Sequence, residues 1–480
     1  MNNQKSVLTN LIWRFAERCG AQGVEFIVSL VLARLLAPEA YGTIALVTVF
    51  IAVMQVFVDS GLANALIQKK DADDIDFSTV FYFNLFWCIA LYLLIFWCAP
   101  FIAIFYDDTS LIPIIRVLSL TIVISGVRNV QQAYVSRSMI FKKFFLATLG
   151  GTIGAAVVGI ALAYLKYGVW ALVIQQIVNS LIGTIILWFT VRWRPKLVFS
   201  FSRLKGLFSY GWKLLASSLL DVIYNNLRQL IIGKMYSSSD LAFYNKGKQL
   251  PNLFITNINS SINSVLLPVM SREQEQRENV KNMTRRSIKV STYVMAPIMM
   301  GIAATAPSVI EILLTEKWLP CVPYLRIFCI TYMFYPIHTA NLNAIKAMGR
   351  SDLFLKLEVC KKLVGLFLLL LTMKHGVMAM AYSLLVGCLA SQIINAWPNR
   401  NLLNYDYCKQ LKDILPSIVL AIVMGVVVSW VDVLDFMPII TLIVQIIIGI
   451  LIYLLGSLCF RMEPFRYLWD MIHSYNEKKS

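Results

Sequence analysis

Residues Leu11–Leu36 read LIWRFAERCGAQGVEFIVSLVLARLL, which is long enough to cross a membrane and strongly apolar over Phe26–Leu36. The stretch nevertheless contains five charged residues, Arg14, Glu17, Arg18, Glu25 and Arg34. Because an ion near a bilayer centre costs about 2.5–3.5 kcal/mol, such residues face protein or water. At about 100° per residue, the first four share one side of the helix, whereas Arg34 lies near its end and can reach the interface. We therefore predict a first helix with a hydrated or ion-paired stripe.

The composition of the whole chain places it among multi-spanning membrane proteins. Of its 480 residues, 58% are hydrophobic and 14% are charged, with a mean hydropathy of +0.69, which excludes a soluble domain of this size. Apolar runs of about 20 residues recur along the chain and predict an all-α protein with about fourteen transmembrane helices. The predicted spans are 11–37, 42–67, 79–105, 113–136, 144–165, 168–191, 211–235, 242–269, 288–314, 322–348, 353–373, 376–398, 412–431 and 437–459. The charges within the first span argue against a cleaved signal peptide.

The net charge of +17 is sorted by loop rather than gathered in one domain, which argues against nucleic acid as a partner. Loops on the side of the termini hold 27 of the 43 lysines and arginines, whereas the opposite loops hold Lys166, Lys317 and Lys374. The positive-inside rule therefore places both termini in the cytoplasm. The external loops are too short for a catalytic domain, so we expect no enzyme. The cysteines and histidines form no metal-ligand spacing, so we expect neither a metal site nor a cofactor.

An internal repeat relates the two halves of the chain. Shifts of 200 to 210 positions place Asp59-Ser60 on Asn259-Ser260 and Pro113-x-x-Arg116 on Pro323-x-x-Arg326. Each repeat has six spans, so both insert the same way up and are expected to enclose a central cavity. The predicted parts are a first bundle over 1–191, a linker over 192–210, a second bundle over 211–398, and two further helices with a cytoplasmic tail over 399–480.

Two spans after the linker carry polar stripes. Asp221, Asn225 and Arg228 share a face of span 211–235. In span 242–269 the stripe is continuous and comprises Asn245, Gln249, Asn252, Thr256, Asn259 and Asn263, with Lys248 beside it. Amides facing lipid would lack hydrogen-bond partners. The stripe therefore lines a hydrated cavity, or it forms interhelical hydrogen bonds within the bundle.

Basic residues outnumber acidic ones within the spans, which favours an anionic ligand. The guanidinium fork of arginine suits phosphate oxygens; the buried arginines are Arg14, Arg18, Arg116, Arg128, Arg228 and Arg326. Each could instead pair with a buried acid, and Arg116 and Arg326 could simply extend to the external interface. Buried carboxylates are also candidate sites for a coupling H⁺ or Na⁺; these candidates are Glu17, Glu25, Asp59 and Asp221. The glycines of Gly150-Gly151-x-x-Gly154 predict close helix packing rather than phosphate binding.

Three motifs resemble a known family. They are Ala33-Arg34-Leu35-Leu36-Ala37-Pro38-Glu39-Ala40-Tyr41-Gly42, Asp59-Ser60-Gly61-Leu62-Ala63-Asn64-Ala65-Leu66-Ile67-Gln68, and Phe243-Tyr244-Asn245-Lys246 with Gln249-Leu250-Pro251. With the fourteen spans and the repeat, the chain resembles the Wzx-type polysaccharide flippases of the MOP superfamily, which share a fold with MATE exporters and lipid II flippases. Its branch is similar to the colanic acid and teichuronic acid exporters.

The resemblance implies a bacterial inner-membrane flippase for undecaprenyl-diphosphate-linked oligosaccharide repeat units, working by alternating access in exopolysaccharide, O-antigen (lipopolysaccharide) or capsule biosynthesis. The implied diphosphate and sugar contacts are Arg14, Arg18, Arg128, Arg228, Arg326, Lys248, Asn252 and Asn259. The implied partners are the lipid-linked oligosaccharide, membrane lipids, a polysaccharide polymerase and a chain-length regulator. The chief alternative is a MATE-like, cation-coupled exporter of small amphipathic molecules, which would have twelve spans and an acidic cavity. A membrane polymerase or ligase would need a large external loop, and a major-facilitator transporter would need a basic loop after its second span.

Overall fold

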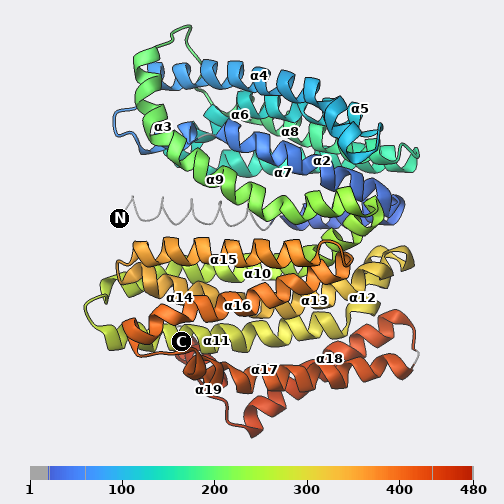
Figure 1. Ribbon diagram of the computed structural model, residues 1–480, viewed down its shortest axis with the longest axis vertical. Helices are drawn as coiled ribbons and strands as arrows, with labels where there is room; N and C mark the ends of the chain where they lie inside the picture. Colours follow the sequence, from blue (N-terminus) through green and yellow to red (C-terminus); the bar gives the residue numbers. More distant parts are fainter. Residues whose placement is uncertain (1–19, 21, 60, 435, 478–480) are drawn as a thin grey trace. The chain divides into compact units, whose positions relative to one another are not determined.

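The computed structural model describes residues 20, 22–59, 61–434 and 436–477. This part of the chain contains helices and connections but no strand, so the predicted all-α class is confirmed. The chain divides into two compact units, Met1–Ala242 and Phe243–Ser480. Figure 1 shows the helices of each unit as bundles of roughly aligned rods.

Unit 1 begins with a helical segment over residues 22–35. Its further helices are α2 (Pro38–Asp59), α3 (Leu62–Gln68), α4 (Asp74–Tyr106), α5 (Leu111–Leu118), α6 (Leu120–Arg137), α7 (Phe141–Tyr164), α8 (Val169–Thr190) and α9 (Phe201–Met235). Helix α10 (Ser238–Arg272) starts at the boundary and continues into unit 2.

Unit 2 contains the remaining helices. They are α11 (Arg277–Ala304), α12 (Ala306–Leu314), the 3-10 helix η1 (Glu316–Cys321), α13 (Val322–Met333), α14 (Tyr335–Ala347), α15 (Ser351–Thr372), α16 (Val377–Leu403), α17 (Tyr407–Trp430), the 3-10 helix η2 (Val431–Leu434), α18 (Pro438–Cys459) and α19 (Glu463–Glu477). Helices α17 and α18 pack on α11, where Tyr453 donates a hydrogen bond to the carbonyl of Tyr293 at 2.9 Å. The last two predicted spans are therefore part of this unit's core.

Ten helices or end-to-end helix pairs in the described chain are long and apolar enough to cross a membrane. They correspond to ten of the fourteen predicted spans. The other four are the first span, 11–37, which is only partly described, and the more polar spans of α9, the pair α13–α14 and α15. Four predicted spans are each split into two helices, at Gly61, Ser119, Thr305 and Phe334. The total of fourteen crossings stays a prediction.

The predicted linker over 192–210 contains the start of a helix. Helix α9 already begins at Phe201, so only residues 191–200 connect α8 to α9. Helix α9 also packs on α2, α3 and α4 of unit 1, whereas the repeat assigns it to the second bundle. The boundary at Ala242 therefore reflects which helices contact each other. The boundary between the two sequence repeats, before residue 211, stays a separate prediction.

Glycines allow two close approaches in unit 1. Gly61 has a φ of +71°, and a Cβ there would lie 2.7 Å from the Cα of Gly211 on α9. Between α7 and α8, a Cβ at Gly151 would lie 2.8 Å from the backbone oxygen of Asn179. The glycine motif of α7 therefore serves close helix packing, as predicted.

The repeat recurs as a matched pair of side-chain contacts. Pro100 within α4 cannot donate to the carbonyl of Phe96, and Arg116 Nε donates to that oxygen at 3.4 Å. Pro307 likewise leaves the carbonyl of Ala303 without its helical donor, and Arg326 Nε donates to it at 3.1 Å. The sequence match of these arginines thus corresponds to the same backbone role in each unit.

Candidate functional site

Three of the predicted site residues, Arg14, Glu17 and Arg18, lie outside the described residues. Glu25 lies on segment 22–35 and is exposed. No described lysine or arginine comes within 4.0 Å of its carboxylate. Of the first helix, only this carboxylate remains as a described candidate for ion coupling.

Arg128 is the centre of a polar cleft inside unit 1. It is half-buried on α6, and with side chains of α7 and α8 it lines a cavity of about 100 Å³. The other polar lining residues are Gln132, Thr148 and Asn179. Gly183 keeps α8 close to this cleft, since a Cβ there would lie 3.3 Å from the carbonyl of Ala147. The cavity therefore combines the Arg128 guanidinium and three further polar side chains with the apolar residues Phe144, Ala147 and Leu187.

Asp59 lies at the end of α2 and interacts electrostatically with Arg128. Its carboxylate also accepts a hydrogen bond from the Gln55 amide at 3.3 Å. The same last turn of α2 is held by Asn129 of α6, whose amide donates to the carbonyl of Val58 at 3.0 Å. The structure thus brings together one predicted ligand-binding arginine and one predicted coupling carboxylate.

Asn84 of α4 is a polar residue that the sequence interpretation missed. It is 1% exposed, and neither side-chain polar atom has a hydrogen-bond partner among the described residues. Buried amides are normally satisfied by protein, water or an ion. In the sequence, Asn84 is a single asparagine within the aromatic-rich segment Phe77–Tyr106. Such a segment is typical of the membrane interface, so this asparagine did not stand out as a candidate.

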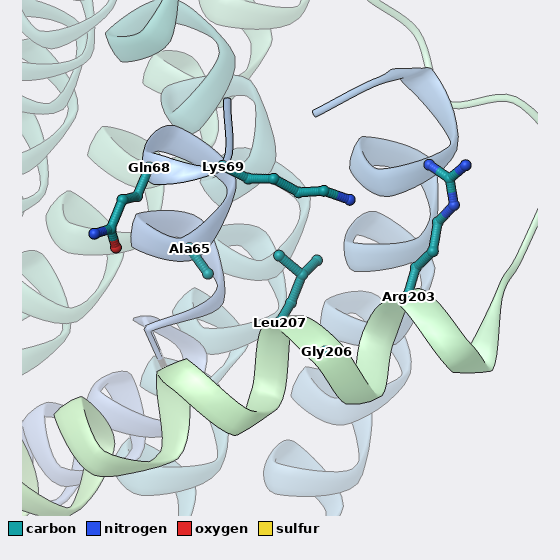
Figure 2. A pocket seen from close by; sticks show the side chains of 6 residues that line it. All are labelled: Ala65, Gln68, Lys69, Arg203, Gly206 and Leu207. Atoms are coloured by element: carbon teal, nitrogen blue, oxygen red, sulfur yellow. The ribbon is translucent and has the colours of Figure 1, made fainter. Parts of the chain in front are cut away.

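A charged network closes one end of unit 1 and borders a cavity of about 440 Å³ (Figure 2). Lys69 lies 2.6 Å from the fully buried carboxylate of Asp76, and Arg203 lies 2.5 Å from Asp73 and 3.3 Å from Asp76. Figure 2 shows Lys69 and Arg203 extending from the ends of α3 and α9, with Gln68 directed away from both. The carboxylates neutralise both cations, so the network joins α3, α4 and α9 rather than offering free positive charge.

Asp73 and Asp76 also cap the start of α4. The Asp73 carboxylate accepts from the N–H groups of Ile75 and Asp76, and Asp76 accepts from the N–H of Asp73 at 3.2 Å. These backbone donors and the Arg203 guanidinium lower the pKa of Asp73 to about 2. Asp73 is therefore ionised over the whole physiological pH range.

Asp221 and Arg228 lie two turns apart on α9. Asp221 is exposed and Arg228 is half-buried. Both have contacts within the protein. Their predicted roles in coupling and in diphosphate binding stay predictions.

The polar stripe of α10 is only partly used by its own unit. Lys248 and Asn259 are half-buried, and Asn252 is exposed. The buried Oδ1 of Asn259 has no hydrogen-bond partner among the described residues. Asn263, by contrast, accepts a hydrogen bond from Asn343 of α14 at 2.8 Å. Asn263 thus makes an interhelical hydrogen bond, and Asn252 is exposed, whereas a hydrated cavity along the stripe stays a prediction.

Arg326 has the backbone contact described above and is otherwise exposed. Its Nε is occupied by the carbonyl that Pro307 leaves free. This contact gives the arginine a structural reason to be present, and its predicted contact with a diphosphate stays a prediction.

A second buried polar network lies in unit 2 and was missed because its histidine appears isolated in the sequence. His338 is 9% exposed, with Nε2 3.3 Å from Cys388 Sγ and Nδ1 3.1 Å from the Asn395 amide. One turn on, Asn341 donates to Gln410 at 2.8 Å and accepts from Asn399 at 2.7 Å. These contacts connect α14, α16 and α17. Among the described residues, no group of three His, Cys, Asp or Glu side chains could hold a metal ion.

Comparison with known proteins assigns the family. A sequence model described as "Polysaccharide biosynthesis protein" matches residues 31–323, which is more than half of the chain. The chain belongs to this family. It is 24% identical over 381 residues to the teichuronic acid biosynthesis protein TuaB of Bacillus subtilis (strain 168), with 78% of each chain covered. It is 24% identical to the succinoglycan biosynthesis transport protein ExoT of Rhizobium meliloti (strain 1021), covering 72% of this chain and 70% of that protein.

A third relative is the lipopolysaccharide biosynthesis protein WzxC of Escherichia coli (strain K12), at 22% identity over 78% of this chain and 76% of that protein. Among solved structures, the lipid II flippase MurJ in an inward closed conformation superposes with a TM-score of 0.75 at 15% identity, covering 95% of this chain and 99% of that one. An inward-facing MATE multidrug transporter superposes with a TM-score of 0.62 at 15% identity, covering 79% of this chain and 94% of that one. The chain of this polysaccharide biosynthesis protein therefore has the MOP-superfamily fold, as the sequence motifs predicted.

Proposed function

We propose that this protein is a transporter, not an enzyme, which moves undecaprenyl-diphosphate-linked oligosaccharide repeat units from the cytoplasmic to the outer leaflet of the bacterial inner membrane. The observation that carries the proposal is the family match over residues 31–323 on a chain that follows a lipid II flippase fold along 95% of its length. Relatives described as polysaccharide biosynthesis and transport proteins support the same substrate class.

The diphosphate is held, in this proposal, by arginines of the membrane-spanning helices. Arg128 lies in a polar cleft and Arg228 is half-buried on α9. Arg14, Arg18 and Arg326 complete the proposed set. A guanidinium donates two parallel hydrogen bonds to phosphate oxygens, and each charge-assisted bond contributes about 1.5–3 kcal/mol. The open amide of Asn252 and the half-buried Lys248 and Asn259 serve the sugar.

Asp59 is the proposed coupling group because it interacts electrostatically with Arg128. Protonation of this carboxylate would release Arg128 from its electrostatic partner and so change the charge that the ligand meets. H⁺ or Na⁺ binding would then be linked to ligand binding through a single arginine. Glu25, Glu17 and Asp221 are the further candidates.

The alternative, a MATE-like exporter of amphipathic cations, is less well supported. The MATE structure covers 79% of this chain, whereas the flippase structure covers 95%. An exporter is expected to have twelve spans, and helices α17 and α18 lie beyond these twelve. Their presence is consistent with the lower coverage by the MATE structure.

Deletion of the gene tests the function directly. We expect lipid-linked repeat units to accumulate in the cytoplasmic leaflet, measured by their accessibility to a glycosidase in inside-out and right-side-out membrane vesicles. An unchanged leaflet distribution together with raised sensitivity to cationic drugs would instead support the exporter.

The diphosphate contacts are tested by replacing Arg14, Arg18 and Arg228 together by alanine. Losing even one charge-assisted contact should reduce polysaccharide export about tenfold or more. A matched control replaces the exposed Arg192, Arg272 and Arg400, which removes the same charge and should leave export unchanged. Normal export by the first variant at normal protein level would refute this assignment.

A further inference from the structure

A cationic pocket in unit 2 lies outside all the sites described above. It has a volume of about 420 Å³ and is formed by residues 282–290 of α11 together with α19. Its charged and aromatic lining residues include Arg285, Arg286, Lys289, Glu463, Arg466 and Tyr467. Four of these six carry a positive charge, and Asp470 is a further acid at the pocket.

Two of the cations are already neutralised. Arg285 makes a bidentate contact with Asp413 of α17, with both nitrogen–oxygen distances at 2.7 Å. Lys289 pairs with Glu463 at the start of α19 and lies 3.9 Å from Asp413. These pairs join α11, α17 and α19 and fix the walls of the pocket.

The other two cations are not neutralised in this way. Among the described residues, neither Arg286 nor Arg466 has a carboxylate within 4.0 Å. The guanidinium carbon of Arg286 lies 3.4 Å from the centroid of the Tyr467 ring. Stacking on an aromatic ring orients the planar fork while leaving its edge donors available. The pocket therefore presents two guanidinium groups that lack acidic partners.

The pocket also lies just after the end of an apolar helix that is long enough to cross a membrane. The apolar span of α18 ends at Cys459, and Glu463 begins α19 only four residues later. Large apolar side chains around this point are exposed, namely Leu458, Phe460 and Trp469. Aromatic residues of this kind occupy the boundary between lipid tails and headgroups. A ligand in the pocket can therefore be a lipid whose tails lie beside α18.

We propose that Arg286 and Arg466 bind the phosphate of an anionic phospholipid, with phosphatidylglycerol as the simplest representative, on the membrane side where α19 lies. The phosphodiester accepts hydrogen bonds from both guanidinium groups, and its acyl chains lie against the exposed apolar residues of α18. Bound lipid holds α19 against α11. This site is separate from the transported substrate and does not depend on the proposed function.

The test measures lipid binding to the purified full-length protein in detergent, by native mass spectrometry and by the lipid-dependent shift in melting temperature. We expect phosphatidylglycerol to bind in preference to phosphatidylcholine. The double variant Arg286→Gln/Arg466→Gln should weaken phosphatidylglycerol binding about tenfold or more, since charge-assisted contacts to phosphate are lost. The control Lys356→Gln/Arg400→Gln removes the same charge from exposed positions of unit 2 and should bind like the original protein.

Two further arms distinguish the possible ligands. Inorganic phosphate at equal concentration should give no comparable shift in melting temperature, and an equal shift would overturn the lipid assignment. Polyprenyl diphosphate should not displace phosphatidylglycerol from the pocket, and displacement that disappears in the glutamine variant would reassign the pocket to the substrate. If the glutamine variant does not fold, Arg286→Lys/Arg466→Lys keeps the charge but not the fork and should bind with intermediate affinity. Unchanged preference for phosphatidylglycerol in either variant refutes the proposal.

Discussion

At the scale of single residues, Asp76 in the first turn of α4 has a structural role that its charge alone does not reveal. Its side chain is fully buried, and it lies beside Lys69 and Arg203 while capping α4. The neighbouring pair of Lys196 and Asp74 has the same chemistry but is largely exposed. Because burial decides how strongly water screens a charge pair, the two pairs should differ sharply in their effect on stability.

Replacing Asp76→Asn should destabilise the protein by about 1–3 kcal/mol, because it leaves two cations beside a neutral buried amide. Asp74→Asn is the matched control and should cost no more than about 1 kcal/mol. Thermal unfolding in detergent measures both. Equal losses for the two variants would contradict the role assigned to burial.

The lowered pKa of Asp73 predicts how the same network responds to acid. Its pKa falls from 3.8 to about 2 in the folded protein. Its stabilising contribution is therefore complete above about pH 4 and is lost as the pH falls towards 2. We expect the difference in melting temperature between the original protein and Asp73→Asn to be constant from pH 5 to 8 and to shrink below pH 4. A difference that changes near pH 6 would show that another titrating group controls this contact.

At the scale of helices, prolines and arginines act in pairs. Pro100 and Pro307 each leave one carbonyl without a helical donor, and Arg116 and Arg326 supply the missing hydrogen bond from a neighbouring helix. A side chain from a neighbouring helix therefore satisfies the carbonyl that each proline leaves free. The contact explains why arginines recur at matching places near the ends of both predicted spans.

A double-mutant cycle tests this pairing. Pro100→Ala restores an N–H that can donate to the Phe96 carbonyl, so Arg116→Gln should cost about 1 kcal/mol in the original protein and clearly less in the Pro100→Ala background. The residual cost reflects the guanidinium over the Phe96 ring, 4.1 Å from its centroid. Equal costs in both backgrounds, measured by thermal unfolding, would rule out the exchange of donors. Arg326→Gln with Pro307→Ala provides the independent repeat of the experiment.

At the scale of the whole molecule, the sorting of basic residues predicts the orientation in the membrane. Helix α15 and the pair α13–α14 are not among the ten described helices or pairs that are long and apolar enough to cross a membrane. The predicted topology requires each of them to cross once, because Lys317 and Lys374 are expected outside and Arg350 inside.

Alkaline phosphatase fusions, which are active only outside the cytoplasm, check this topology. Fusions after Lys317 and after Lys374 should be active, and fusions after Arg350 and at the C-terminus should be inactive. Activity after Arg350 would show that α13–α14 does not cross as one unit. Activity at the C-terminus would reverse the predicted orientation.

The sequence by itself determined the all-α membrane fold, the family and the order of the helices, because burial in a bilayer imposes long apolar runs that are legible without tertiary contacts. It also identified Asp59 and Arg128 as intramembrane charges, although not as neighbours. Only the tertiary structure brought these two together. The buried network of His338 and the basic pocket at α19 likewise depend on helices far apart in the chain. The physical reason is that hydropathy is a local property, whereas the pairing of charges and the burial of polar groups depend on which helices become neighbours.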